Sequence, residues 1–515
     1  MDIQPHKPAM FFAESPRLRI IASVFFVSAG VTIAAIQSGS GHHREGLVVG
    51  LIGCALAYLA AGPISLDALV IGWFATTPLA SFYIRFPTDR SIVTYDRAVF
   101  ALVITAVLLT SIRNVTNTGI VRGDATRSGS ELFGEQAPAR LTSLSLTRFE
   151  IAWVLLSVLA LSSAVSRSNN FIYALRIAID TFWLPLLAFH FARNHLDLRG
   201  RGGVFLLCGI LLALFLFATG AVEFITGADL FAYKGSEIVR EGERRVNGPF
   251  AADSSFAIIC LLIFLFLLAA PRVFRVRFDR MGGLAYTCAL VASASGAMLP
   301  LFRAVALALI VCWFIWQALN PQHRWMHLSR SALRRSAAIG LTLIALAGVI
   351  VTIAPSLVAD RLTDPRSAYG RVATWQAATE IMFDNPLFGV GLTNYSDYYD
   401  ATHYYSDQPP EELLETKASD RPHSNLLWIG AELGLIGFAL YIAANVYLFM
   451  IGWSALKRTS ESWRPNAASC FVSLVAAYWI TGLTLASGYY SDLNLYFFFL
   501  LGVLSNSSPT PSVRS

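Results

Sequence analysis

The sequence has little charge. Only 14% of its 515 residues are Asp, Glu, Lys or Arg, whereas soluble domains carry roughly 25%. Hydrophobic residues make up 55% of the chain, so the composition excludes an ordinary soluble domain and indicates a membrane protein. The net charge of +6 is typical of the Lys and Arg excess in cytoplasmic loops, and we prefer this interpretation to nucleic-acid binding.

The sequence also lacks the patterns that bind nucleotides or metals or that build a disulfide framework. It contains no P-loop, no Rossmann glycine motif and no nucleophile elbow, so nucleotide hydrolysis and acyl transfer have no support. Its six cysteines form no CxxC pair and no Cys/His cluster. The acidic span over 397–415 has no metal-ligand spacing. We therefore expect no metal and no cofactor.

Long apolar runs recur along the whole chain. A helix needs about 20 mostly apolar residues to cross a membrane. The sequence therefore predicts an all-α fold, a polytopic transmembrane helix bundle of about 12–14 spans with a large, partly helical extracytoplasmic loop. The candidate spans are 18–36, 46–62, 64–84, 98–112, 149–165, 171–192, 203–226, 253–270, 282–300, 301–319, 337–354, 424–453, 466–487 and 493–505.

Positive charge in the short loops predicts the orientation. The arginine-rich loops, which we expect in the cytoplasm, are 193–202, 271–280, 320–336 and 454–465. The segments 227–252 and 355–423 then lie outside. The expected domains are a bundle of spans 1 to 11 over 1–354, the large extracytoplasmic loop over 355–423, and C-terminal spans with a cytoplasmic tail over 424–515.

The large loop contains an amphipathic pattern. Arg371, Trp375, Ala378 and Met382 recur at helical spacing. This predicts a helix over 370–384, since Pro386 disfavours helix at the residue before it. We expect the helix to lie on the membrane surface with Trp375 as an interfacial anchor. Arg371 is then either a charge beside lipid headgroups or part of a site.

A histidine stands directly before an apolar span. His423 has an unperturbed pKa of ~6.5, which suits a general base, although a histidine at a helix mouth is also a common cap or surface residue. Asn425 and Glu432 are seven residues apart, so both should point from one helix face into the bundle. They are possible supporting residues, together with Trp375.

Arginines also occur in segments that the predicted orientation places on the outer face. Arg244 and Arg245 precede an Asn-Gly-Pro-Phe turn, and Arg303 stands at the start of a span. Arginine suits bidentate phosphate recognition, whereas snorkelling to headgroups is the alternative for Arg303. Arg176 and Asp180, four residues apart, should neutralise each other along one helix face.

These pieces together resemble the O-antigen ligase and O-antigen polymerase family of bacterial membrane glycosyltransferases. The matching stretches are RVNGPF at 245–250, Arg303, YGRVATWQAATEIMFDNPLFGVG at 369–391 and RPHSNLLWIGAELGLIGF at 421–438. The resemblance implies His423 and Arg371 as catalytic residues, and Arg303 and Arg245 as diphosphate-binding residues. We expect the neighbouring Arg244 to bind the diphosphate as well, because arginine suits phosphate recognition.

The resemblance also implies the reaction and its place. The partners would be an undecaprenyl diphosphate-linked glycan donor, a lipid A–core or other glycan acceptor, and membrane lipids, without nucleic acid. The site would face the periplasm from the bacterial inner membrane. Ligase and polymerase share this donor chemistry, and a flippase or exporter of lipid-linked sugars is an alternative from another class.

Overall fold

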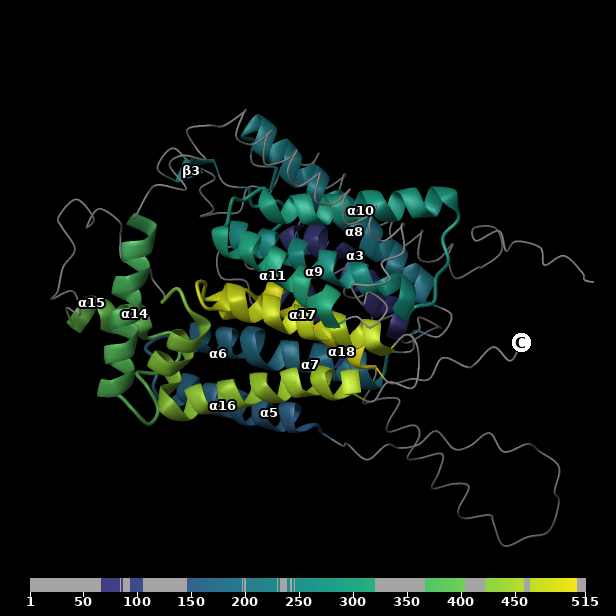
Figure 1. Cartoon of the computed structure of the whole chain (residues 1–515). Coiled ribbons are helices and arrows are strands. Elements are labelled where there is room, and N and C mark those ends of the chain that lie inside the picture. Colours follow the sequence, from purple (N-terminus) through teal and green to yellow (C-terminus); the bar gives the residue numbers. More distant parts are fainter. Residues whose placement is uncertain are drawn as a thin grey trace, which may run out of the picture. The chain divides into compact units, whose positions relative to one another are not determined.

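The chain divides into two compact units, Met1–Arg122 and Gly123–Ser515. The computed structural model (Figure 1) describes residues 66–83, 85–86, 93–104, 146–196, 198, 201–228, 230–231, 239–240, 243–244, 246–319, 366–402, 422–457 and 464–506. In the first unit, helix α3 (Leu66–Tyr83) precedes a short antiparallel pair, β1 (Arg85–Phe86) and β2 (Val93–Thr94), and a helix over 95–104. Within this unit, Trp73 Nε1 and Ser81 Oγ donate to the buried Asp96 at 2.8 and 3.1 Å.

The second unit is a helix bundle. Its elements are α5 (Arg148–Ser166), α6 (Phe171–Ala178), the π-helix η1 (Ile179–Trp183), α7 (Leu184–Asn194), α8 (Gly202–Thr226), β3 (Val239–Arg240), β4 (Glu243–Arg244), α9 (Asp253–Val273), α10 (Arg280–Met298), α11 (Arg303–Leu319), α14 (Arg366–Asp384), α15 (Tyr395–Thr402), α16 (Asn425–Lys457), α17 (Arg464–Gly482), η4 (Ser487–Tyr489) and α18 (Ser491–Ser505).

The predicted fold class is confirmed. Within the described residues, six helices are long and apolar enough to cross a membrane, and three shorter apolar helices accompany them. The strands of the described parts are two-residue pairs. The expected spans 18–36, 46–62 and 337–354 lie outside the described residues, so the total of about 12–14 spans stays a prediction. Helix α9 is buried along almost its whole length, and it packs against α8, α10, α17 and α18.

The second unit has two ends that differ in character. At what we call the loop end, the turn over 166–170 contacts the segment 389–397, and Asn394 Nδ2 donates to Arg167 O at 2.8 Å. At the arginine-rich end, Asn506 Nδ2 donates to Ala192 O at 3.1 Å, and Arg272 Nη1 donates to Asn466 Oδ1 at 3.1 Å. The turn over 166–170 thus meets the large loop at one end, and residues in or beside the loops 193–202, 271–280 and 454–465 meet at the other, while the side of the membrane that each end faces stays a prediction.

Helix α16 is interrupted at Gly434, which has φ of 68°. The break frees the carbonyls of Ala431 and Glu432, and these accept from Val390 N and Gly391 N, both at 3.0 Å. In the other direction, Leu435 N donates to Pro386 O at 2.7 Å. The turn over 386–391 thus satisfies the backbone groups that the break exposes, which a buried helix interruption requires. This exchange fixes the large loop to the start of α16.

Gly389→Ala should destabilise the protein because this glycine has φ of 66° and a Cβ would overlap the backbone of Ala431 and Glu432. We expect a loss of about 1–3 kcal/mol, measured as a lower thermal midpoint in detergent. Gly283→Ala in α10 is the matched control, because its Cβ would meet a neighbour only at ordinary contact distance. Equal midpoints for the two variants would contradict this account.

Candidate functional site

Helix α14 ends at Asp384 as predicted, but it begins at Arg366 rather than at 370. Its inner face does not lie on lipid. Ala377, Ala378 and Ile381 are fully buried in a core cluster with Ala431 of α16. The expectation that this face lies on the membrane surface is therefore wrong, and the reason is that α16 offers the apolar helix a protein surface to pack against. Figure 1 shows α14 against the first part of α16.

Trp375 lies where α14 meets the segment before α16. It is half-buried, and its indole Nε1 donates to the backbone carbonyl of His423 at 3.2 Å. This contact joins α14 to the residue before α16 across 48 positions of the chain. The bond reaches the backbone of His423 and does not involve its imidazole. Trp375 therefore holds the backbone of His423, while its supporting role in the reaction stays a prediction.

His423 lies at the loop end, two residues before α16 begins. The backbone N–H of Ser424 donates to Pro422 O at 2.7 Å, and Trp428 N donates to Ser424 O at 3.0 Å. These bonds tie the histidine's neighbours to the first turn of the helix. His423 itself is half-buried, which gives the imidazole a fixed surrounding while keeping it accessible.

Arg371 acts electrostatically on this histidine, and Arg303 acts on Arg371. Burial, and then the charge of Arg371, lower the pKa of His423 from 6.5 to about 4. Burial, and then the charge of Arg303, lower the pKa of Arg371 from its ordinary value. Arg371 is therefore within electrostatic reach of both Arg303 and His423, although 120 positions separate Arg303 from His423. Three of the predicted site residues are linked in this way.

Arg303 is the first residue of α11 and is exposed. The turn before it is tight, since Leu301 has φ of 59°. Pro300 lies in this turn. The turn between α10 and α11 thus presents the guanidinium at the helix N-terminus, where an anion is also favoured by the helix dipole.

Asn425 and Glu432 point from α16 into the bundle, as predicted, and both are buried. Asn425 accepts from Gly488 N at 2.9 Å and donates to Ser487 Oγ at 2.7 Å. Glu432 accepts from Trp428 Nε1 at 2.7 Å and from Tyr489 OH at 2.8 Å. Both side chains hold η4 beneath the site. Ser487 and Tyr489 were missed at the sequence level, because nothing marks the short turn that contains them.

The predicted diphosphate residues Arg244 and Arg245 are not placed in the site. Arg245 and the side chain of Arg244 lie outside the described residues, so their roles stay predictions. The turn after them is described. The N–H groups of Asn247 and Gly248 donate to Glu223 Oε2 at 3.1 and 2.7 Å.

Arg167 holds the large loop in place, and no sequence pattern marks it. Its Nη1 donates to Gly389 O at 2.9 Å, and its guanidinium lies 5.3 Å from the centroid of the Phe388 ring. Arg176 and Asp180 form the predicted pair, with Nε and Oδ2 3.7 Å apart.

The tyrosines of the acidic span divide into two groups. Tyr395 and Tyr399 are buried, and their rings stack on each other with centroids 5.7 Å apart. Tyr395 OH donates to Thr374 O at 3.1 Å. These two rings therefore belong to the core between α14 and α15, whereas Tyr398 is exposed.

The described part of the chain is thus a polytopic helical membrane protein with a histidine and two arginines gathered at one end. Residues 281–442 match the family model described as O-antigen ligase. This match includes Arg303, Arg371 and His423, and it confirms the resemblance: the chain carries an O-antigen ligase family domain. A search of curated proteins gives no match.

The match covers less than a third of the chain and supports its function in general terms. The described helices indicate a multi-pass membrane protein, and the matched domain supports an O-antigen ligase or polymerase type of function. The match implies a glycosyltransferase-like role and lipid-linked glycan substrates.

Proposed function

We propose that the protein transfers a glycan from undecaprenyl diphosphate to a sugar hydroxyl of a surface acceptor, lipid A–core or a similar molecule, at the outer face of the bacterial inner membrane. One observation carries this proposal: a histidine with a depressed pKa lies within the electrostatic reach of Arg371, and Arg371 lies within that of Arg303. The site therefore combines a neutral base with fixed positive charge.

In this reaction, a bond forms between the acceptor oxygen and the anomeric carbon of the glycan. The bond between that carbon and the diphosphate oxygen breaks, and undecaprenyl diphosphate leaves with both electrons. His423 takes the proton of the acceptor hydroxyl. Arg371 and Arg303 stabilise the negative charge that develops on the diphosphate, because preorganised donors act strongly in a partly desolvated site. No metal or nucleotide sugar is part of this proposal.

The break in α16 supports the geometry of this mechanism. The large loop, which we propose to lie over 355–423, would be held to the bundle by the exchange of backbone bonds at Gly434. Arg371 and His423 come from the two sides of this junction. A rigid junction keeps a base and a charge clamp at a fixed separation, which is a large part of catalytic positioning.

The test uses purified protein and undecaprenyl diphosphate–glycan, with lipid A–core and a second lipid-linked glycan offered separately as acceptors. We expect transfer to lipid A–core. Elongation of lipid-linked material without lipid A–core would instead assign a polymerase. Movement of the lipid-linked glycan across a membrane without covalent change would assign a flippase or exporter and overturn the proposal.

The pH dependence should reflect the depressed pKa of His423. The reactive form is the neutral imidazole, so activity is retained above the pKa and lost below it. Since this pKa is about 4 in the free protein, kcat/KM should stay level down to about pH 5 and fall only near pH 4.

The bound donor should shift this limit. A diphosphate beside Arg371 offsets the charge that depresses the pKa of His423, so the acid limb of kcat should lie at higher pH than that of kcat/KM. Both profiles are measured with purified protein at low and saturating donor. If kcat/KM fell to half its maximum near the ordinary histidine pKa of ~6.5, the prediction would be contradicted.

A further inference from the structure

A second site lies at the arginine-rich end, opposite the gathered arginines and histidine. A cavity of about 660 Å³ opens there between the start of α5, the end of α7, the end of α16, the start of α17 and the end of α18. Cavities that bind small molecules have volumes of about 300–1,000 Å³. The space is therefore large enough for a ligand.

The lining of this cavity combines polar and apolar side chains. Polar side chains lie near the helix ends: Thr147, Arg148, Arg193, Ser454, Ser505 and Asn506. Apolar side chains lie there too, such as Leu146 and Leu504, and they continue deeper along the helices. Tyr447 stands ten residues before the end of α16, which is about 15 Å at 1.5 Å per residue.

Met450 lies between Tyr447 and the helix end, and Phe471 lines the cavity from α17. A ligand that fits this lining has a polar head near the helix ends and a hydrocarbon tail along the helices.

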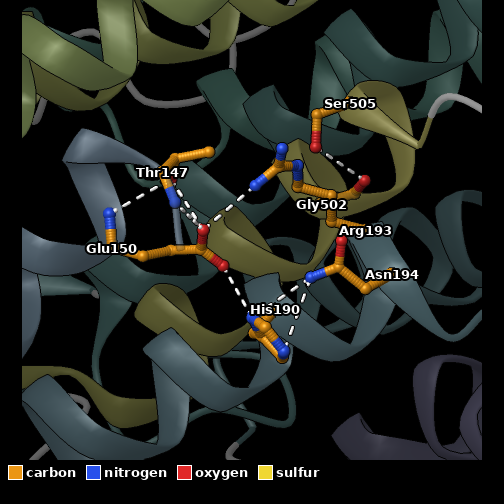
Figure 2. A network of polar contacts seen from close by, with 7 residues as sticks. All are labelled: Thr147, Glu150, His190, Arg193, Asn194, Gly502 and Ser505. Atoms are coloured by element: carbon orange, nitrogen blue, oxygen red, sulfur yellow. Dashed lines mark hydrogen bonds and ion pairs between the residues drawn. The ribbon is translucent and has the colours of Figure 1, made fainter. Parts of the chain in front are cut away.

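The charge of the cavity is positive. The nearby carboxylate, Glu150, is fully buried and turned to partners within the protein: His190 Nδ1 at 2.7 Å, Arg193 Nη1 at 3.0 Å and the backbone N–H of Thr147 at 2.7 Å (Figure 2). The charge of Arg193 is thus balanced by Glu150. Arg148 is exposed at the start of α5 and makes no ion pair with a described residue. Its charge remains for a ligand.

We propose that this cavity binds one anionic phospholipid, with the phosphate beside Arg148 and an acyl chain along Tyr447 and Met450. Basic pockets between transmembrane helices are typical sites for anionic headgroups. Ser505 and Asn506 line the same pocket, and their side chains are held in place because Ser505 Oγ donates to Gly502 O and Asn506 Nδ2 donates to Ala192 O and Leu196 O. By the charge of its loops, this end belongs to the cytoplasmic leaflet.

The bound lipid would connect helices that are far apart in the sequence. The cavity separates the ends of α16 and α18 from the start of α5, and a bound headgroup would bridge them. This site is independent of the proposed transfer reaction, so its test does not use activity.

The test is native mass spectrometry of the delipidated full-length protein with phosphatidylglycerol and with phosphatidylcholine of the same acyl chains. We expect tighter binding of phosphatidylglycerol, and Arg148→Gln should weaken it about five-fold, as one basic group near a headgroup contributes about 1 kcal/mol. Arg148→Glu should weaken it further.

Arg277→Gln is the matched control, because Arg277 is exposed at the same end but does not line the cavity. It should leave binding unchanged. Glycerol 3-phosphate should not compete, since it lacks the acyl chains that the deep apolar lining would hold. Equal binding of the two lipids, an equal loss in Arg148→Gln and Arg277→Gln, or full competition by glycerol 3-phosphate would each overturn the proposal.

Discussion

His423→Ala should lower the rate of glycan transfer by about 10²–10⁴, the usual contribution of a general base. The variant should fold, because the bond from Trp375 reaches the backbone carbonyl of His423 and not its imidazole. The measurement is kcat for transfer from undecaprenyl diphosphate–glycan, with the thermal midpoint in detergent as the check on folding. Near-normal kcat at a normal midpoint would remove this histidine from the mechanism.

Trp375→Phe removes the hydrogen bond that supports the proposed base and keeps the base itself. The phenyl ring keeps most of the packing but loses the N–H that donates to His423 O at 3.2 Å. We expect a smaller loss of kcat than in His423→Ala, with the acid limb of the pH profile still set by the histidine. A loss as large as that of His423→Ala with a normal midpoint would assign Trp375 a direct part in the reaction.

Much of the bundle could be predicted from the sequence because the membrane constrains it so strongly. Spanning helices must be apolar and long, so the expected spans over 203–226 and 253–270 agree closely with Gly202–Thr226 and Asp253–Val273. The end of α14 at Asp384 followed from Pro386, which restricts the residue before it.

The contacts that build the site were harder to predict. In the sequence, Gly434 is one more glycine in an apolar helix. The structure shows that the helix breaks there and bonds to the turn over 386–391. The apolar face of α14 has the same pattern whether it packs on lipid or on protein. Trp375 was therefore assigned to the membrane surface, although α16 covers the helix beside it.

The gathering of Arg303, Arg371 and His423 was predictable for a different reason. Charged groups in an apolar chain are few, so those on one predicted face stand out, and the resemblance to the family added their order. Their supports were not predictable. Arg167 and Tyr489 act through single contacts with Gly389 O and Glu432 Oε1, and no periodicity or spacing marks such a contact in advance.

Arg371→Ala should lower kcat by about 10²–10³, the usual cost of losing one preorganised charge-stabilising contact. Arg371→Lys should recover little, because an ammonium does not reproduce the bidentate fork of guanidinium. Gln376→Ala is the matched control, since Gln376 is exposed on the same helix. It should be nearly neutral.

The same variants give a second, independent readout. Arg371 is one cause of the low pKa of His423, after burial. Removing its charge should therefore raise that pKa, and the acid limb of the residual activity in Arg371→Ala should move to higher pH, whereas Arg371→Lys should keep it low. Full activity in Arg371→Lys would show that a point charge is sufficient. An unchanged acid limb in Arg371→Ala would show that the arginine and the histidine do not act on one another, and would separate the two halves of the proposed site.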